Sequence, residues 1–161
     1  MHIRSADFSD LPAINRIYND AVLNSTATFD TEFRTEEQCV EWWHSHGVRY
    51  PVFVCMLENE VIAWASLSRW SDRCAYESTV EFSVYVDKSF RGKGAGKKLM
   101  EALLEEGKKR KFHTVISRIT QDNEVSFHLH KQAGFEKTGV MKEVGFKFGK
   151  WLDVEIWQII F

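Results

Sequence analysis

Three glycines within six residues, Arg91-Gly-Lys-Gly-Ala-Gly96, separate a strand-like run from a helical run, and this junction limits the possible folds more than any other segment. Residues 79–86 alternate polar and apolar side chains as a half-buried strand does, and residues 97–104 have helical apolar spacing. Glycine backbones approach ligands closely, and the free N–H groups at a helix start favour anions. The segment therefore predicts a strand–loop–helix unit that binds a diphosphate.

The glycine spacing excludes two common nucleotide-binding loops. A G-x-G-x-x-G loop would need glycine where the chain has Lys97 or Leu99, and a P-loop would need Ser or Thr where it has Lys98. The pattern that fits is Arg-x-x-Gly-x-Gly, from Arg91 to Gly96. Because so short a pattern occurs by chance, its meaning depends on the rest of the chain.

Length and charge restrict the class of protein. With 161 residues and 44% hydrophobic content, the chain is expected to form one domain over residues 1–161. A formal net charge of −2 gives no reason to expect a nucleic acid or an anionic membrane as partner. No apolar run approaches the roughly 18 residues of a membrane span, and no signal peptide is visible, so we expect a cytoplasmic protein.

The cysteines and histidines do not suggest a metal centre. Cys39, Cys55 and Cys74 are odd in number and have the spacing of neither a zinc site nor a redox pair. The six histidines have no convincing ligand spacing either. We therefore expect reduced thiols and no metal cofactor.

Strand and helix patterns alternate along the chain. The predicted strands cover residues 2–6, 52–58, 61–69, 78–87, 113–120, 135–144 and 151–161, and the predicted helices cover residues 10–24, 35–43, 97–110 and 123–133. This order predicts an α/β fold with about seven strands and about four helices.

Segments downstream of the glycine loop carry a family resemblance. The loop is followed by Asn123-Glu-Val-Ser126, Leu129-His130 and Gly134-Phe135. Together these segments resemble the GNAT N-acetyltransferases, which bind acetyl-coenzyme A. The resemblance implies the GNAT-type acyltransferase fold, a central mixed sheet flanked by helices, with acetyl-coenzyme A as the acetyl donor.

Four further segments are similar to one subgroup of that superfamily, the phosphinothricin and methionine sulfoximine N-acetyltransferases. They are Thr28–Glu32, Arg73–Tyr76, Thr79–Glu81 and Gly145–Asp153. The similarity implies direct acetylation of the amino group of a small amino acid analogue, and a homodimer. Trp151 and Asp153 are expected to support the terminal hairpin.

Acetyl transfer to an amine requires a base, and Glu81 is the candidate. An α-amino group has a pKa near 8, so it is mostly protonated at neutral pH and must lose a proton before it attacks. Glu81 lies on the polar face of the strand that leads into the glycine loop, and the subgroup has its base there. It would act directly or through a water molecule. The alternative is a carboxylate on a solvent-facing strand.

The resemblance also implies a set of cofactor contacts. Backbone N–H groups of Val84, Tyr85 and Val86, at a splayed strand end, would polarise the thioester carbonyl. An ordinary strand bonded to its neighbour is the alternative. The remaining implied cofactor contacts are Arg91, Gly92, Lys93, Gly94, Ala95, Gly96, Lys97, Asn123 and Ser126.

The leaving thiolate needs a proton donor. His130 lies seven residues after Asn123, where many members of the superfamily have a tyrosine, and a histidine can donate at physiological pH. His130 is therefore the second predicted catalytic residue, with a purely structural helix histidine as the alternative.

Substrate contacts are predicted at four positions. Arg73 has the planar fork that suits a carboxylate or phosphinate, and Phe29, Tyr76 and Tyr85 would form the walls of the pocket. Each has an ordinary alternative, because loop arginines are usually solvated and aromatic rings usually fill cores.

Two other functions are compatible with the sequence. A peptide N-terminal or lysine acetyltransferase would use the same cofactor loop, but Arg73 and the terminal hairpin argue mildly against it. A non-catalytic acyl-coenzyme A sensor is the other, and the presence of both Glu81 and His130 argues against it.

Overall fold

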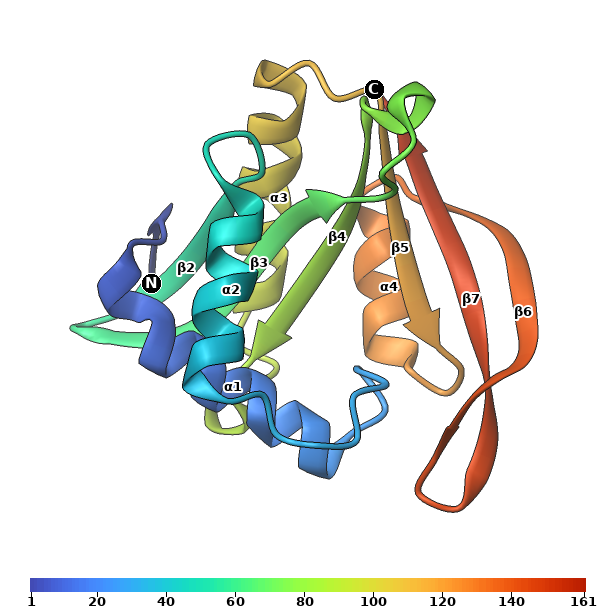
Figure 1. Ribbon diagram of the computed structural model, residues 1–161, viewed down its shortest axis with the longest axis horizontal. Coiled ribbons are helices and arrows are strands. Elements are labelled where there is room, and N and C mark those ends of the chain that lie inside the picture. Colours follow the sequence, from blue (N-terminus) through green and yellow to red (C-terminus); the bar gives the residue numbers. More distant parts are fainter.

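The computed structural model describes residues 1–161, which form a seven-stranded sheet in the order β1-β2-β3-β4-β5-β7-β6 (Figure 1). The strands are β1 (His2–Ser5), β2 (Val52–Leu57), β3 (Glu60–Arg69), β4 (Thr79–Val86), β5 (Thr114–Thr120), β6 (Glu136–Lys147) and β7 (Lys150–Ile160). The helices are α1 (Leu11–Asn24), α2 (Glu36–His46), α3 (Ala95–Lys109) and α4 (Glu124–Gln132). The predicted α/β class and numbers of elements are confirmed. No helix combines the length and apolar character needed to cross a bilayer.

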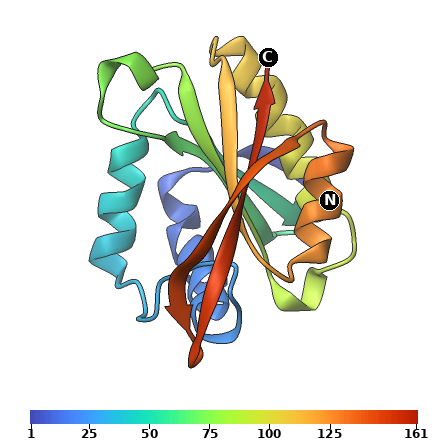
Figure 2. The ribbon, with the colours of Figure 1, turned by 90° about the vertical axis from the view of Figure 1, so that its right-hand side faces the viewer.

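Helices cover both faces of the sheet, with α1 and α2 on one side and α3 and α4 on the other (Figure 2). The side chains of the central strand β3 alternate between the two resulting cores. Ala65 and Leu67 pack on the α3 side, and Trp64 packs on the side of α1 and α2. This explains why nearly all of β3 is buried and why its sequence is almost continuously apolar.

Several element boundaries differ from the predicted ones. Helix α2 continues past Trp43 to His46 and ends at Gly47, whose φ is +53°. Helix α3 begins at Ala95, before the predicted Lys97, because left-handed Gly94 immediately precedes it. Strands β6 and β7 extend to a two-residue turn at Phe148 and Gly149, both with positive φ, as such tight hairpins require.

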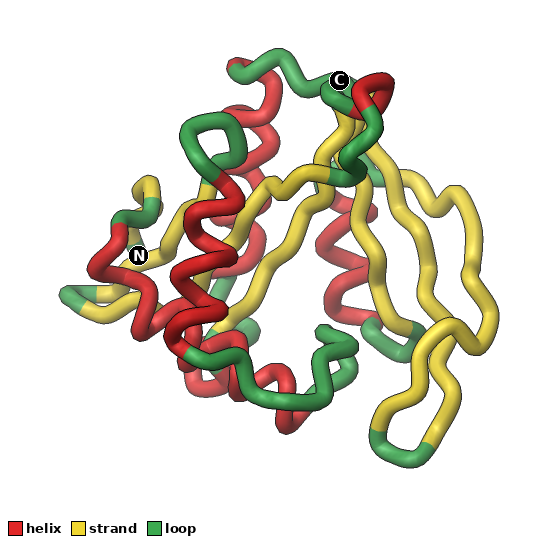
Figure 3. Tube along the Cα trace, in the orientation of Figure 1, coloured by secondary structure: helices red, strands yellow, loops and turns green.

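Strands β4 and β5 are the one parallel pair in the sheet, and they are paired over only three residues each. Residues 79–81 of β4 pair with residues 114–116 of β5. Beyond that point β4 stays bonded to β3 and β5 stays bonded to β7, so the two strands separate (Figures 1 and 3). The rest of β4 therefore presents to β5 an edge without strand partners, which is the splay predicted near residues 84–86.

Candidate active site

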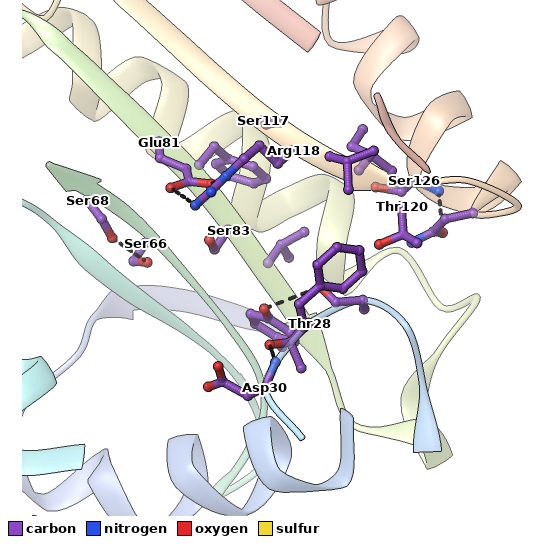
Figure 4. Close-up of a pocket in the computed structure, with 18 of the residues that line it drawn as sticks. Thr28, Asp30, Ser66, Ser68, Glu81, Ser83, Ser117, Arg118, Thr120 and Ser126 are labelled. Carbon is purple, nitrogen blue, oxygen red and sulfur yellow. Dashed lines mark hydrogen bonds and ion pairs between the residues drawn. The ribbon is translucent and has the colours of Figure 1, made fainter. Parts of the chain in front are cut away.

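A cavity of about 600 Å³ lies where β4 and β5 separate (Figure 4). Its walls come from β3, β4, β5, α4, the terminal hairpin and the segment that connects α1 to α2. The fold thus brings together segments from nearly the full length of the chain. Of the residues predicted for the site, Phe29, Glu81, Val84, Tyr85, Asn123, Ser126 and His130 line this cavity.

Glu81 faces the cavity and is held by an arginine that sequence reasoning did not identify. Arg118 Nε donates to Glu81 Oε1 at 2.6 Å, and Arg118 Nη2 donates to Oε2 at 2.8 Å (Figure 4). This two-point contact fixes the plane of the carboxylate, whose side chain is 18% exposed, and it raises the pKa of Arg118. The signal for Arg118 was absent from the sequence because β4 and β5 meet through long-range pairing.

The glycine loop has the geometry of an anion site. Gly92 and Gly94 have φ of +75° and +87°, and a Cβ added to either would meet no atom within 4 Å. The space above them is open, and the first turn of the 15-residue helix α3 directs its free N–H groups toward it. Gly96 differs, because a Cβ added there would lie 3.6 Å from the Val86 side chain and 3.7 Å from that of Leu129. The loop therefore fits a diphosphate.

The basic side chains of the loop make surface contacts of their own. Arg91 Nε donates to the carbonyl of Val86 at 3.3 Å, and Lys93 Nζ donates to the carbonyl of Ser89 at 3.1 Å. Lys97 lies 3.9 Å from Glu101. All three are exposed beside the glycines and outside the lining of the cavity, where they are free to turn toward a phosphate.

Asn123 and Ser126 form the start of α4 at the cavity wall. Asn123 precedes the helix and accepts a hydrogen bond from the Ser126 N–H at 3.1 Å through its side-chain oxygen. This cap leaves the Asn123 amide N–H₂ group available to a ligand. Both residues line the cavity, where the predicted contacts with a cofactor are geometrically possible.

His130 is buried and held between two polar partners. Its Nδ1 lies 2.8 Å from the carbonyl of Ser126, so that nitrogen carries the proton, and Nε2 accepts from the Ser117 hydroxyl at 2.9 Å. Burial lowers the pKa of His130 to about 4. The imidazole is therefore neutral at physiological pH, and its single N–H already donates to the Ser126 carbonyl.

The predicted substrate residues are not all brought together. Phe29 lines the cavity and lies against Gly145, where an added Cβ would be only 2.1 Å from the ring. Tyr85 also lines it, stacked on Trp64 with ring centroids 4.9 Å apart. Arg73 and Tyr76 are exposed and lie outside the lining.

The terminal hairpin is joined to the cavity wall by a buried lysine. Lys147 is 4% exposed, and its Nζ donates to the carbonyl of Thr28 at 2.8 Å, next to Phe29. Burial lowers the pKa of this lysine. Asp153 accepts hydrogen bonds from the Lys142 side chain at 2.7 Å and the Glu143 N–H at 2.9 Å, which stabilises the hairpin from within.

Comparison with known proteins identifies the class to which this fold and site belong. Residues 14–135 match the acetyltransferase (GNAT) family, and the chain belongs to that family. Among its relatives, an L-methionine sulfoximine/L-methionine sulfone acetyltransferase of Pseudomonas paraeruginosa is 38% identical over 159 residues, with 98% of this chain and 92% of that protein covered.

Solved structures agree with the computed fold. A GNAT superfamily phosphinothricin acetyltransferase from Sinorhizobium meliloti, in complex with acetyl-coenzyme A, superposes with a TM-score of 0.94 at 36% identity, covering 99% of this chain and 87% of that one. A ribosomal-protein-alanine N-acetyltransferase from Brucella melitensis superposes with a TM-score of 0.97 at 38% identity, covering both chains completely.

Proposed function

We propose that this protein transfers the acetyl group of acetyl-coenzyme A to the amino group of a small amino acid analogue of the methionine sulfoximine, methionine sulfone or phosphinothricin type. The observation that carries this proposal is the position of Glu81. Its carboxylate faces a cavity of about 600 Å³ beside the separated end of β4, next to a loop that fits a diphosphate. The relatives named for such substrates support the choice of amine.

Glu81 is the proposed general base. A carboxylate in this position accepts the proton of the ammonium group, directly or through one water molecule, and leaves a neutral amine to attack. The Arg118 fork holds both oxygens in place, so that the carboxylate does not rotate as it gains the proton. Attack is direct, since neither catalytic segment contains a cysteine to form an acyl-enzyme.

The donor is held mainly by backbone groups in this proposal. The N–H groups at Gly92–Lys97 bind the diphosphate, with Arg91, Lys93 and Lys97 adding charge, and Asn123 and Ser126 contact the pantetheine arm. The bound thioester supplies the activated acetyl group. The free edge of β4 at residues 84–86 provides the N–H donors that polarise its carbonyl, a stabilisation that is strongest where water is excluded.

His130 is better suited to position other groups than to donate a proton. At a pKa of about 4 the imidazole has no second proton to give at neutral pH, and its Nδ1–H is bonded to the Ser126 carbonyl. We therefore propose that His130 orients Ser117 and the first turn of α4. The prediction of His130 as the acid has no support in this geometry, and in this proposal the departing thiolate takes the second proton, which the attacking nitrogen loses as the amide forms.

Peptide acetylation is the second candidate. The Brucella relative named as a ribosomal-protein-alanine N-acetyltransferase favours it. Against it, the terminal hairpin closes one side of the cavity through Phe29 and Lys147, which leaves less room for a peptide chain.

We further propose a homodimer in the cytoplasm. The terminal hairpin carries the exposed apolar side chains Val144, Phe146, Phe148 and Trp151, which a second copy could cover. All three cysteines are free, as expected in a reducing compartment.

A panel of amines tests the proposed function. Purified protein is mixed with acetyl-coenzyme A and each amine, and release of free coenzyme A thiol is followed. We expect turnover of methionine sulfone, methionine sulfoximine or phosphinothricin. Turnover of N-terminal peptides alone would replace the proposal with peptide acetylation, and coenzyme A binding without turnover of any amine would favour the sensor function.

A further inference from the structure

Arg34, in the segment between α1 and α2, lines the cavity without an ion-pair partner. It lies between two aromatic faces, with its Cζ 4.3 Å from the Tyr18 ring centre and 4.9 Å from that of Trp42. The other cavity arginine, Arg118, is paired with Glu81, whereas no carboxylate lies within 4 Å of Arg34. Charged groups withdrawn from water are usually paired, so a half-buried arginine without a direct ion-pair partner is unusual.

The hydrogen bonds of Arg34 are also incomplete. Its Nε donates to Asn15 Oδ1 at 2.8 Å, but its Nη2 is buried without any partner. Asp30, the nearest acidic residue of the lining along the chain, instead accepts the Tyr18 hydroxyl. A buried donor left unpaired is destabilising, and an acceptor brought by a ligand would relieve that cost.

A second unpaired donor lines the same cavity. Trp64 is 2% exposed, and its Nε1 has no hydrogen-bond partner. Its ring contacts the Trp42 ring, which also lies over Arg34, with centroids 5.1 Å apart. The aromatic cluster thus brings together two N–H donors that have no acceptor in the protein.

We propose that Arg34 and Trp64 bind an oxygen of the amine substrate, either its α-carboxylate or an oxo group of its side chain. Both residues offer donors only, and the guanidinium adds a positive charge, so the site selects an acceptor with negative charge. This inference rests on the proposed function and names the substrate group that this part of the cavity recognises.

Binding of a substrate oxygen at Arg34 Nη2 and Trp64 Nε1 requires a small movement of the surrounding aromatic rings. Both atoms are closed to water, and Tyr85 stacks on Trp64 with its hydroxyl 3.5 Å from the Ala27 carbonyl, a weak tether. Because Tyr85 stacks on Trp64, a substrate that reaches the Trp64 N–H is expected to shift the Tyr85 ring.

Binding and turnover of three compounds test the inference. Methionine sulfone has both oxygen groups, methionine sulfone amide lacks the carboxylate, and methionine lacks the sulfone oxygens. Each is titrated by calorimetry into protein saturated with coenzyme A, and each is assayed with acetyl-coenzyme A. The variants are Arg34→Met and Trp64→Phe, which keep much of the side-chain volume but remove the donors.

We expect Arg34→Met to weaken methionine sulfone binding at least tenfold, and Trp64→Phe to weaken it roughly threefold to tenfold. The variants identify the oxygen by the preference that they lose. If the wild type binds methionine sulfone more tightly than its amide and the variant does not, the recognised group is the carboxylate. If the wild type binds methionine sulfone more tightly than methionine and the variant does not, the recognised group is the oxo group. The controls are Arg49→Met, an arginine stacked over Phe112 outside this cavity, and Trp43→Phe, a tryptophan outside it, and both should retain both preferences.

Equal loss of affinity for all three compounds, or affinity within twofold of wild type in both variants, would overturn the inference. Thermal unfolding of each variant identifies a change that only disturbs folding, and Trp64→Phe decides the question if Arg34→Met does not fold. Wild-type binding of methionine sulfone without turnover would refute the proposed function and leave this site standing. Absence of binding by every analogue would refute both.

Discussion

The candidate site has two ends that are constructed differently, the glycine loop and the cavity beside it. At the glycine loop, the groups that face a ligand are backbone N–H groups, placed by left-handed Gly92 and Gly94 and by the first turn of α3. At the other end the groups are side chains held by distant partners: Glu81 by Arg118, and Arg34 by Asn15.

The two ends therefore tolerate different substitutions. A backbone site depends on chain conformation, so most side-chain changes there have small effects, while a lost glycine disturbs the whole loop. A side-chain site depends on single atoms, so isosteric changes that leave the fold intact are expected to be severe. Substitutions at both ends test that contrast.

Glu81→Gln should reduce kcat/KM by roughly 10²- to 10⁴-fold at neutral pH, because the amide cannot accept the ammonium proton. Affinity for coenzyme A, measured by calorimetry, should stay unchanged. Glu77→Gln, an exposed glutamate paired with Arg49 at 3.6 Å, is the matched control. Full turnover in Glu81→Gln would show that Glu81 is not the general base.

His130→Asn should make stability less sensitive to acid. The folded-state pKa of about 4 lies below the usual 6.5, so the unfolded chain binds the proton first as the pH falls, and stability is lost between pH 6.5 and pH 4. From pH 7 to pH 5 the wild type should lose roughly 2 kcal/mol that the variant does not.

Urea unfolding at the two pH values measures this difference. His46, whose pKa burial also lowers, is present in both proteins and cancels. Equal pH dependence of the two proteins would show that folding does not lower the pKa of His130, and the case against its role as the acid would fall.

Arg118→Met should lower kcat on the order of tenfold with little change in KM for the amine, because the Glu81 carboxylate loses its fixed orientation. Arg34→Met should do the reverse and act mainly on KM. Steady-state kinetics with methionine sulfone separates the two. Identical effects would contradict the assignment of one arginine to the base and the other to the substrate.

Gly94→Ala should weaken coenzyme A binding by roughly fivefold to thirtyfold at most. An alanine with the positive φ of Gly94 costs about 1–2 kcal/mol, and the loop would change conformation to avoid that cost. Gly139→Ala is the matched control, since its Cβ also meets open space but its φ is ordinary. If both variants bind coenzyme A like wild type, the glycine loop is not the diphosphate site.

Much of the fold could be predicted because its signals are local. The alternation in residues 79–86, Gly47 after α2 and the glycine loop before α3 each act within one element or its cap. The observed ends of elements differ from the predicted ones where long-range contacts extend an element. Helix α2 continues to His46, whose side chain is hydrogen-bonded to Ser68 in β3. The hairpin turn is shorter than the predicted gap at residues 145–150 and contains only Phe148 and Gly149, because pairing between β6 and β7 continues past Gly145.

The sequence alone placed Glu81 on the polar face of a strand, Asn123 at a helix start and the glycines between strand and helix, since periodicity and chain conformation are written locally. Only the tertiary structure decided that Arg118 holds Glu81, that His130 is neutral and that Arg34 and Trp64 share a cavity while Arg73 lies outside its lining. Those outcomes depend on strand pairing and burial. Both are set by contacts between residues far apart in the chain, which no local pattern specifies.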